Sequence, residues 1–273
     1  MRGWPMTMAT GTPFAKPDPQ GMRSSQSIGS DLTPINAIAV LRRDGYDAEV
    51  IFANLAVWFD AVARRGDDVM AVDEWLLEVA ELPILRVYGW LGDWVSVGYF
   101  GEIALAEAKF PGVNSVRRWT GGGVVDHRRD WTYTLVVPQG EGIAKSRGAE
   151  SYLRIHEALA GCLDAEGIEN QLSAGAEQTG DALCFENPVG HDLIGPDLRK
   201  LAGAGQRRSR SGLLHQGSVG VSCGDERISR QRAESFASRL AAHWSAKEFH
   251  PDPQDIKHRV GARYANQTWT RRR

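Results

Sequence analysis

The sequence is poor in cysteine: only Cys162, Cys184 and Cys223 occur among its 273 residues, and they are widely spaced. An odd number of cysteines without a CxxC pair argues against a disulfide framework and against a cysteine metal site. It is typical of a reducing cytoplasm, where we expect this protein to act. No apolar run approaches the ~18 residues that a membrane span requires, so no membrane partner is expected. The formal net charge of −2 indicates no general attraction to nucleic acid.

Common nucleotide and metal motifs are also missing. The glycine-rich stretch matches neither G-x-x-x-x-G-K-S/T nor G-x-G-x-x-G, and the sequence contains no HExxH. These absences disfavour a nucleoside triphosphatase, a dinucleotide enzyme and a metalloprotease. We therefore expect no metal and no tightly bound cofactor.

The chain divides into a low-complexity start and a globular remainder. Residues 1–33 are rich in Met, Gly, Pro, Ser and Thr without a hydrophobic period, which predicts a disordered tail. Residues 34–54 form a lead-in of uncertain structure, and the globular part begins near Leu55. The three arginines at 271–273 are expected to form a solvated end.

Hydrophobic periodicity predicts alternating helices and strands in the globular part. The strands at 84–88 and 94–99 are expected to pair as a hairpin across Gly92 and Asp93, and the glycines at 121–123 are expected to lie between two strands of one sheet. Helices are predicted near 69–80, 103–108, 152–163 and 233–244, and strands at 84–88, 94–99, 114–118, 131–137, 182–185, 192–194 and 213–221.

The most informative stretch, residues 116–127, reads V-R-R-W-T-G-G-G-V-V-D-H. Glycines lack Cβ, so Gly121, Gly122 and Gly123 allow backbone N–H groups to approach a ligand closely. Arg117 and Arg118 supply planar guanidinium groups that suit phosphate or carboxylate. The stretch therefore predicts a binding site for an anion or an activated acyl group, although a glycine turn beside solvated arginines would look similar.

This stretch resembles the R-R-x-x-G-G-G-x-V-x-H signature of the lipoate–protein ligase A family, within the biotin/lipoate protein ligase superfamily. A second block, R-K-L-A-G-A-G-Q-R-R at 199–208 with L-H-Q-G-S at 214–218, resembles the family's G-R-K-I-x-G-S-A-Q-R-R and L-H-Q-G-S-I. The resemblance covers residues 55–265, which implies a catalytic domain there and leaves 266–273 as a basic tail. It implies an α/β (α+β) fold in which a mixed β-sheet is flanked by helices. The acyl- or adenylate-binding residues that it implies are Arg117, Arg118, Thr120, Gly121, Gly122, Gly123, His127, Gly203 and His215.

Two residues are candidates for catalysis. Lys200 stands at the lysine position of the family, where a fixed ammonium group would stabilise negative charge on an acyl oxygen. Cys184 lies sixteen positions before Lys200 in D-A-L-C-F-E-N-P and resembles the nucleophile of the family's cysteine-dependent octanoyltransferases. A nearby ammonium would favour the thiolate form of this cysteine. A buried structural cysteine is the alternative interpretation.

The resemblance implies attachment of an octanoyl or lipoyl group to a lysine of a lipoyl carrier domain, either of a 2-oxoacid dehydrogenase E2 or of the glycine-cleavage H protein. We favour octanoyl transfer from an acyl carrier protein through a Cys184 thioester, because too few residues follow Val221 for the extra C-terminal domain of the best-known ATP-dependent ligases. A ligase that uses ATP and Mg²⁺ to form lipoyl-AMP is the first alternative, and a non-catalytic binder of lipoyl domains or acyl groups is the second. Two positions depart from the family pattern: Arg128 replaces the usual Asp, and Ala204 replaces a serine.

Overall fold

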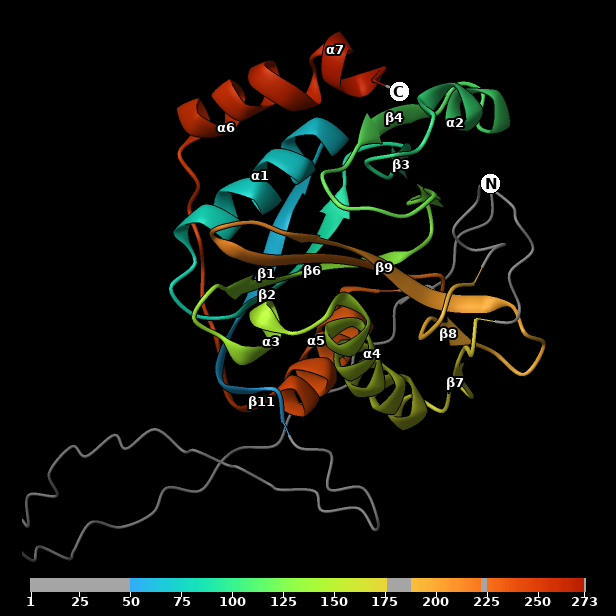
Figure 1. Cartoon of the computed structure of the whole chain (residues 1–273), viewed down its shortest axis with the longest axis vertical. Coiled ribbons are helices and arrows are strands. Elements are labelled where there is room, and N and C mark those ends of the chain that lie inside the picture. The colour runs from blue at the N-terminus through green and yellow to red at the C-terminus, as the bar shows by residue number, and fades with distance from the viewer. Residues whose placement is uncertain (1–49, 176–187, 222–224, 273) are drawn as a thin grey trace, which may run out of the picture. The chain divides into compact units, whose positions relative to one another are not determined.

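The computed structural model describes residues 50–175, 188–221 and 225–272. The predicted disordered tail, the strand expected at 182–185, Cys184 and Cys223 lie outside these residues. Within them the chain forms one α/β unit that contains a large mixed sheet, a small sheet and helices on both faces of the large sheet (Figure 1). This architecture confirms the expected fold class.

The large sheet has eight strands in the order β11-β1-β2-β6-β10-β9-β8-β7. β1 pairs in parallel with β2 and β11, whereas the remaining neighbours pair antiparallel. The strands are β1 (Phe52–Arg64), β2 (Ile84–Trp90), β6 (Trp131–Pro138), β7 (Gln171–Leu172), β8 (Leu193–Ile194), β9 (Lys200–Arg208), β10 (Gly212–Val219) and β11 (Ala241–Ala246).

A second sheet of three strands lies beside the large one, in the order β4-β3-β5. Its members are β3 (Trp94–Val97), β4 (Asn114–Arg117) and β5 (Val124–Asp126). The helical elements are α1 (Gly66–Val79), α2 (Ile103–Lys109), α3 (Gly142–Lys145), α4 (Gly148–Ala165), α5 (Glu226–Leu240), α6 (Pro253–Arg259), the π-helix η1 (Val260–Tyr264) and α7 (Gln267–Thr270).

Alternation along the central strands divides the core into two layers. On β10, Leu213 and Val219 pack toward α4 and α5, whereas Leu214 packs toward α1. On β2, Leu85 and Val87 belong to the layer that includes α4 and α5, whereas Ile84 belongs to the layer that includes α1. Because successive side chains of a strand point to opposite faces, this pattern also decides which polar residues can reach a site between the two sheets.

The expected hairpin of 84–88 with 94–99 is wrong. Both edges of β2 are occupied, one by β1 and the other by β6, so β3 cannot join it and pairs instead with β4 and β5. The glycines at 121–123 lie between two strands of one sheet, as expected, but these are β4 and β5 of the small sheet, and the strand at 131–137 belongs to the large one. The intervening strand β5 was not predicted.

Two C-terminal predictions are also corrected. The helix expected at 233–244 ends at Leu240, because the backbone becomes extended at Ala241 and pairs as β11 with the free edge of β1. The arginine-rich end is not fully solvated: α7 packs onto the domain, and the indole N–H of Trp269 donates to the Arg117 carbonyl over 3.1 Å. Its Arg271 pairs with Glu107 over 3.0 Å.

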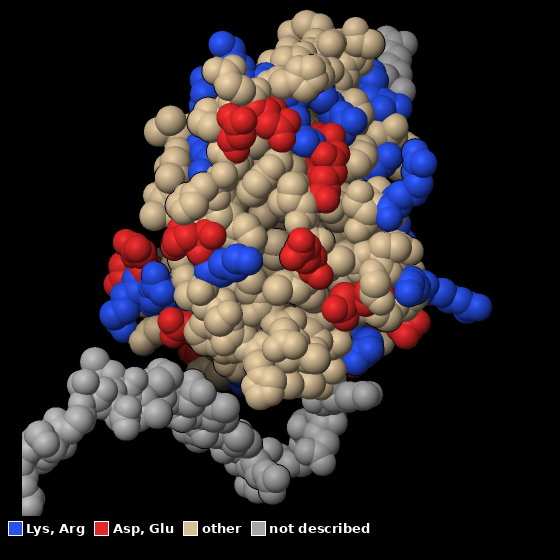
Figure 2. Space-filling model, turned by 90° about the vertical axis from the view of Figure 1, so that its left-hand side faces the viewer, with Lys and Arg blue, Asp and Glu red and all other residues tan. Residues whose placement is uncertain are grey.

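Opposite charges alternate on the outer face that carries α1 and α6 (Figure 2). Arg259 of α6 pairs with Glu78 of α1 and with Asp255 of its own helix. Within the described ranges, no helix combines the length and apolar character required to cross a membrane.

Candidate active site

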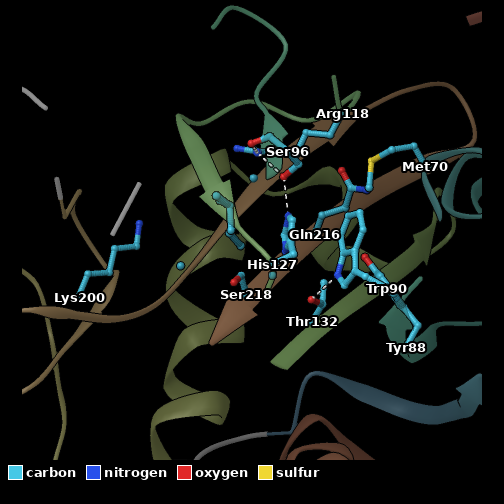
Figure 3. A pocket seen from close by; sticks show the side chains of 15 residues that line it. Met70, Tyr88, Trp90, Ser96, Arg118, His127, Thr132, Lys200, Gln216 and Ser218 are labelled. Atoms are coloured by element: carbon cyan, nitrogen blue, oxygen red, sulfur yellow. Dashed lines mark hydrogen bonds between the residues drawn. The ribbon is translucent and has the colours of Figure 1, made fainter. Parts of the chain in front are cut away.

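A narrow cavity lies between the large sheet and the small sheet (Figure 3). Lys200 stands apart at one side of it, and Met70, Tyr88 and Trp90 gather at the other side. The cavity therefore has a cationic end and an end formed by an apolar and two aromatic side chains. Its lining consists of Met70, Tyr88, Trp90, Ser96, Arg118, Val125, His127, Thr132, Lys200, Gly203, Ala204, Gly205, Gln216, Gly217 and Ser218.

Lys200 is held at the cationic end by a buried carboxylate. Its ammonium group lies 2.7 Å from an oxygen of Asp192, which is itself completely buried. The Tyr152 hydroxyl donates to the same carboxylate over 2.5 Å, and the Val189 N–H donates over 2.7 Å. Burial and then Asp192 raise the pKa of Tyr152, so its hydroxyl remains a donor. These contacts fix the position of the Lys200 charge.

Gly203 makes room for this arrangement. A Cβ at Gly203 would lie 2.7 Å from Asp192 Oδ1 and closer still to the Lys200 side chain. The end of the Lys200 side chain therefore occupies the space that a side chain at position 203 would fill.

His127 lines the cavity in a defined orientation. Its Nδ1 lies 2.8 Å from Asp130, and because a carboxylate only accepts, Nδ1 carries the proton. The opposite nitrogen, Nε2, lies 2.7 Å from the Ser96 hydroxyl, and the ring stacks on Trp90 with centroids 4.0 Å apart. Ser218 also donates to Asp130.

Asp130 is thus the acidic partner of His127. Position 128, where the family pattern has Asp, is Arg in this chain. Arg128 turns outward and pairs with Asp126 over 2.7 Å, so the changed charge at position 128 does not enter the cavity. The spacing of three residues between His127 and Asp130 was visible in the sequence, but its pairing required the turn after β5.

Arg118 connects the cavity to the glycine loop. Its guanidinium donates to the carbonyl groups of Gly121 and Gly123 and to both oxygens of Ser96. A Cβ at Gly98 would overlap the Gly122 carbonyl oxygen, so the loop packs directly on the backbone after β3. The three glycines do not line the cavity, and the carbonyl oxygens of Gly121 and Gly123 face Arg118.

Thr120 and Gln216 continue into a buried polar network that the sequence did not reveal. Thr120 donates to the Gln216 side chain over 2.7 Å, and Gln216 donates to Asp73 over 2.7 Å. Asp73 also accepts from Arg86 over 2.6 Å. Burial alone would lower the pKa of Arg86, but Asp73 and then Asp60 outweigh it, so the pKa is raised. Arg86 therefore belongs to the buried core.

Besides Thr120 and the three glycines, Arg117 and His215 were also predicted to bind the ligand and do not line the cavity. Arg117 is fully buried, and its guanidinium donates to the carbonyl groups of residues 98, 99, 101, 269, 270 and 272, which leaves none of its N–H groups for an anion. His215 lies on the opposite face of β10, against Tyr133 and Gln206. Burial lowers its pKa well below the ordinary value, so the ring is neutral. The structure therefore does not bring Arg117 or His215 to the cavity.

Two further residues of α4, His156 and Cys162, are buried and do not line the cavity. His156 is a packing residue: it is completely buried and hydrogen-bonded to the His191 carbonyl over 2.6 Å. Cys162 is buried, and burial raises the pKa of its thiol to about 11, which suits an inert side chain. Cys184, the predicted nucleophile, lies outside the described residues. In the part of the chain that is described, no group of three or more His, Cys, Asp or Glu side chains is arranged to hold a metal ion.

Comparison with known proteins identifies the family. The model of the lipoyl protein ligase A/B catalytic domain matches residues 66–262. The chain belongs to this family. It is 33% identical over 183 residues to the octanoyltransferase LipM of Carboxydothermus hydrogenoformans, covering 63% of this chain and 67% of that relative. It is 32% identical over 188 residues to the octanoyltransferase LipM of Moorella thermoacetica, covering 63% and 68%.

Solved structures agree on the fold. The chain superposes with a TM-score of 0.60 on a lipoate protein ligase of T. acidophilum with bound lipoic acid, at 17% identity, covering 80% of this chain and 98% of that one. At this identity the similarity describes the fold alone. The family, together with the cavity that joins Lys200 to an apolar end, establishes this domain as an enzyme of the lipoylation type.

Proposed function

We propose that this enzyme transfers an octanoyl group from an acyl carrier protein to a lysine of a lipoyl carrier domain, in the cytoplasm, through a thioester on Cys184. The observation that carries the proposal is the cavity with the buried Lys200–Asp192 pair at one end and an apolar end opposite. Relatives named as octanoyltransferases support the choice of acyl group.

The apolar end suits the hydrocarbon part of an octanoyl group. Met70, Tyr88 and Trp90 form it (Figure 3), and each buried CH₂ group contributes about 0.8 kcal/mol to binding. At the opposite end, the Lys200 ammonium lies where it can attract the carbonyl oxygen of the acyl group. That attraction increases as the oxygen becomes negative during attack, which is the condition for catalysis.

The chemistry takes two steps. The Cys184 thiolate attacks the octanoyl carbonyl, a new C–S bond forms to the enzyme, the C–S bond to the carrier protein breaks, and the released carrier thiolate takes up a proton. A neutral lysine amine of the acceptor domain then attacks the enzyme thioester. The C–N bond forms, the bond to Cys184 breaks, the amine nitrogen loses one proton, and the Cys184 thiolate is regenerated. The acceptors are the lipoyl domains of 2-oxoacid dehydrogenase E2 subunits and the glycine-cleavage H protein.

The test uses octanoyl-carrier protein without ATP. Intact-mass measurement is expected to show an octanoyl adduct on the enzyme that hydroxylamine removes, and addition of an apo lipoyl domain is expected to move the adduct to that domain. Cys184→Ser should lose the adduct, because a serine hydroxyl without a dedicated base is a far weaker nucleophile. Cys223→Ser is the matched control and should keep it.

Three outcomes would overturn parts of the proposal. An adduct on Cys162 or Cys223 would reject Cys184 as the nucleophile. Lipoate-dependent ATP–pyrophosphate exchange with an active Cys184→Ser variant would establish the ligase route instead. Absence of acyl transfer from octanoyl-carrier protein and from lipoate with ATP and Mg²⁺ would leave a non-catalytic binder.

A further inference from the structure

A cluster of arginines and aromatic rings lies beside the glycine loop. Its centre is Tyr99, which follows β3 and whose N–H donates to the Thr120 carbonyl over 2.8 Å. The Arg207 guanidinium lies 5.1 Å from the Tyr99 ring centre, and the Arg272 guanidinium lies 4.0 Å from it. We call this surface the Tyr99 patch and define it by Tyr99, Phe100, Trp119, Arg207, Trp269 and Arg272.

We propose that the Tyr99 patch is the docking surface for the acyl carrier protein that donates the octanoyl group. This inference rests on the proposed function. The partner is defined by its chemistry, which is an acidic protein surface together with a phosphodiester that anchors the long arm carrying the acyl thioester.

The first argument is charge. Arg207 and Arg272 have no ion pair with a carboxylate among the residues described, whereas the neighbouring Arg271 and Arg263 pair with Glu107 and Glu74. The buried Nε of Arg207 also has no acceptor among the described residues. Two guanidinium groups beside one ring, both without a carboxylate, form a surface that a phosphate or a row of carboxylates would neutralise.

The electrostatic state of Arg117 agrees with this excess of positive charge. The pKa of Arg117 is lowered, first by burial and then by the nearby charge of Arg272. A bound anion beside Arg272 would relieve that repulsion. Aromatic rings hold both guanidinium groups in place, since Arg207 also lies 4.5 Å from the Trp119 ring and Arg272 lies 5.3 Å from the Trp269 ring.

The second argument is an exposed aromatic side chain. Phe100 is 86% exposed and contacts Tyr99 edge-on, with ring centroids 4.8 Å apart. Aromatic and arginine side chains are the residues most enriched at the energetic centres of protein interfaces. An exposed phenylalanine next to Arg207 and Arg272, which have no carboxylate partner in the described part of the chain, therefore fits an interface that is apolar at its centre and anionic on the partner's side.

The third argument is position relative to the cavity. Gly203, Gly205 and Arg207 alternate along β9 and so share one face, and the first two line the cavity. At ~3.3 Å per residue, Arg207 lies ~7 Å beyond Gly205 and ~23 Å from Lys200 along the strand. A donor whose acyl group hangs on a long arm can place its phosphodiester at Arg207 and its thioester in the cavity. An acceptor lysine side chain is too short to span that distance.

The experiment compares two octanoyl donors, namely octanoyl-carrier protein and octanoyl-N-acetylcysteamine, which has neither a protein surface nor a phosphate. The variants are Arg207→Gln with Arg272→Gln, and separately Phe100→Ser. The matched control is Arg271→Gln, a neighbouring arginine that pairs with Glu107. We expect the ratio of kcat/KM for the carrier donor to that for the small donor to fall at least about tenfold in the double variant, through KM, and to stay within about twofold in the control.

Binding of the carrier protein is measured independently by fluorescence anisotropy at several salt concentrations. Affinity is expected to fall in the double variant, together with the steepness of its salt dependence. Unchanged carrier affinity in the double variant overturns the docking proposal even if transfer is active. An increase in KM for the apo lipoyl domain, with the carrier donor unaffected, would assign the patch to the acceptor and also overturn it. If wild-type enzyme binds the carrier protein but transfers no octanoyl group, the proposed function fails and the docking surface stands.

Discussion

The replacement Gly203→Ala tests whether the position of Lys200 controls catalysis separately from folding. A Cβ at this position of β9 would lie 2.7 Å from Asp192 Oδ1 and still closer to the end of the Lys200 side chain. Gly203 has no positive φ, so an alanine backbone fits there. The atoms in conflict belong mainly to the flexible end of a lysine. We therefore expect Lys200 to move and the strand to stay.

The distance by which the Lys200 ammonium group must move determines how much the Gly203→Ala replacement lowers the transfer rate. Unstrained contact needs a separation of about 3.5 Å, so the Lys200 ammonium group must shift by ~1 Å. A misplacement of this size at a reacting centre costs about a hundredfold in rate, or ~2.7 kcal/mol of transition-state stabilisation. The free energy of unfolding should change by less than ~1 kcal/mol, because alanine restricts the unfolded chain and partly offsets the disturbed ion pair.

The assay measures single-turnover octanoyl transfer by mass spectrometry and the free energy of unfolding by urea denaturation. Gly89→Ala is the matched control, since Gly89 also lies within a strand and a Cβ there meets no heavy atom within 4 Å. A Gly203→Ala variant with a transfer rate within twofold of the wild type would refute the reasoning. So would a rate loss that Gly89→Ala shares, or one accompanied by unfolding.

Three further predictions concern buried polar groups. Arg117→Ala should detach α7, and limited proteolysis within 265–272 should become faster; an unchanged cleavage pattern would contradict the role of its six carbonyl contacts. Asp73→Ala should lower the free energy of unfolding by about 3 kcal/mol, since it leaves the buried Arg86 charge undercompensated, whereas Asp67→Ala, at a half-exposed ion pair, should cost less than about 1 kcal/mol. Burial lowers the pKa of His156 to about 4. Between pH 6.5 and 4, this side chain is therefore protonated in the unfolded chain but neutral in the folded chain. Stability should therefore fall as the pH drops from about 8 toward 4, and this residue should account for a loss of about 1.4 kcal/mol at pH 5.5 relative to pH 8; a His156→Gln variant with the same pH slope would contradict this.

The sequence predicted elements more reliably than their partners. Helices α1, α2 and α4 and strands β2, β6 and β10 follow hydrophobic periods that a reader can count. The period of a strand does not say which edge is free, and this is why 84–88 and 94–99 were paired incorrectly. Likewise Ala241 and Trp244 continue the helical spacing of α5, but the open edge of β1 draws them into a strand.

The sequence pointed to site residues that stand in a recognisable motif, but not to the residues that hold them in place. Lys200, Gly203 and His127, which the family resemblance singles out, line the cavity, whereas nothing in the sequence showed that Asp192 and Asp130 pair with Lys200 and His127. In a sequence, an aspartate in a loop that contacts solvent cannot be distinguished from one that pairs with a buried ammonium group. Only the folded backbone distinguishes the two.

His215 shows a different limit. It stands next to Gln216 on β10, and alternation guarantees that only one of the two can face the cavity. The sequence shows that the two side chains lie on opposite faces of the strand, but it does not show which face borders the cavity. The structure places Gln216 in the cavity and His215 in the core, where burial keeps it neutral.

The side chains of the adjacent residues Arg117 and Arg118 also point to opposite sides of the chain. One contacts the glycine loop at the cavity, and the other contacts the segments that carry the Tyr99 patch. Arg118 holds the glycine loop at the cavity. Arg117, on the opposite side of the chain, binds the carbonyl groups of the segment 98–101 and of the C-terminal residues 269–272. Those two segments carry Tyr99, Phe100, Trp269 and Arg272, so one buried guanidinium fixes both halves of the Tyr99 patch. The arginine expected to bind the substrate therefore acts one step away from it, by fixing the surface on which we propose that the donor docks.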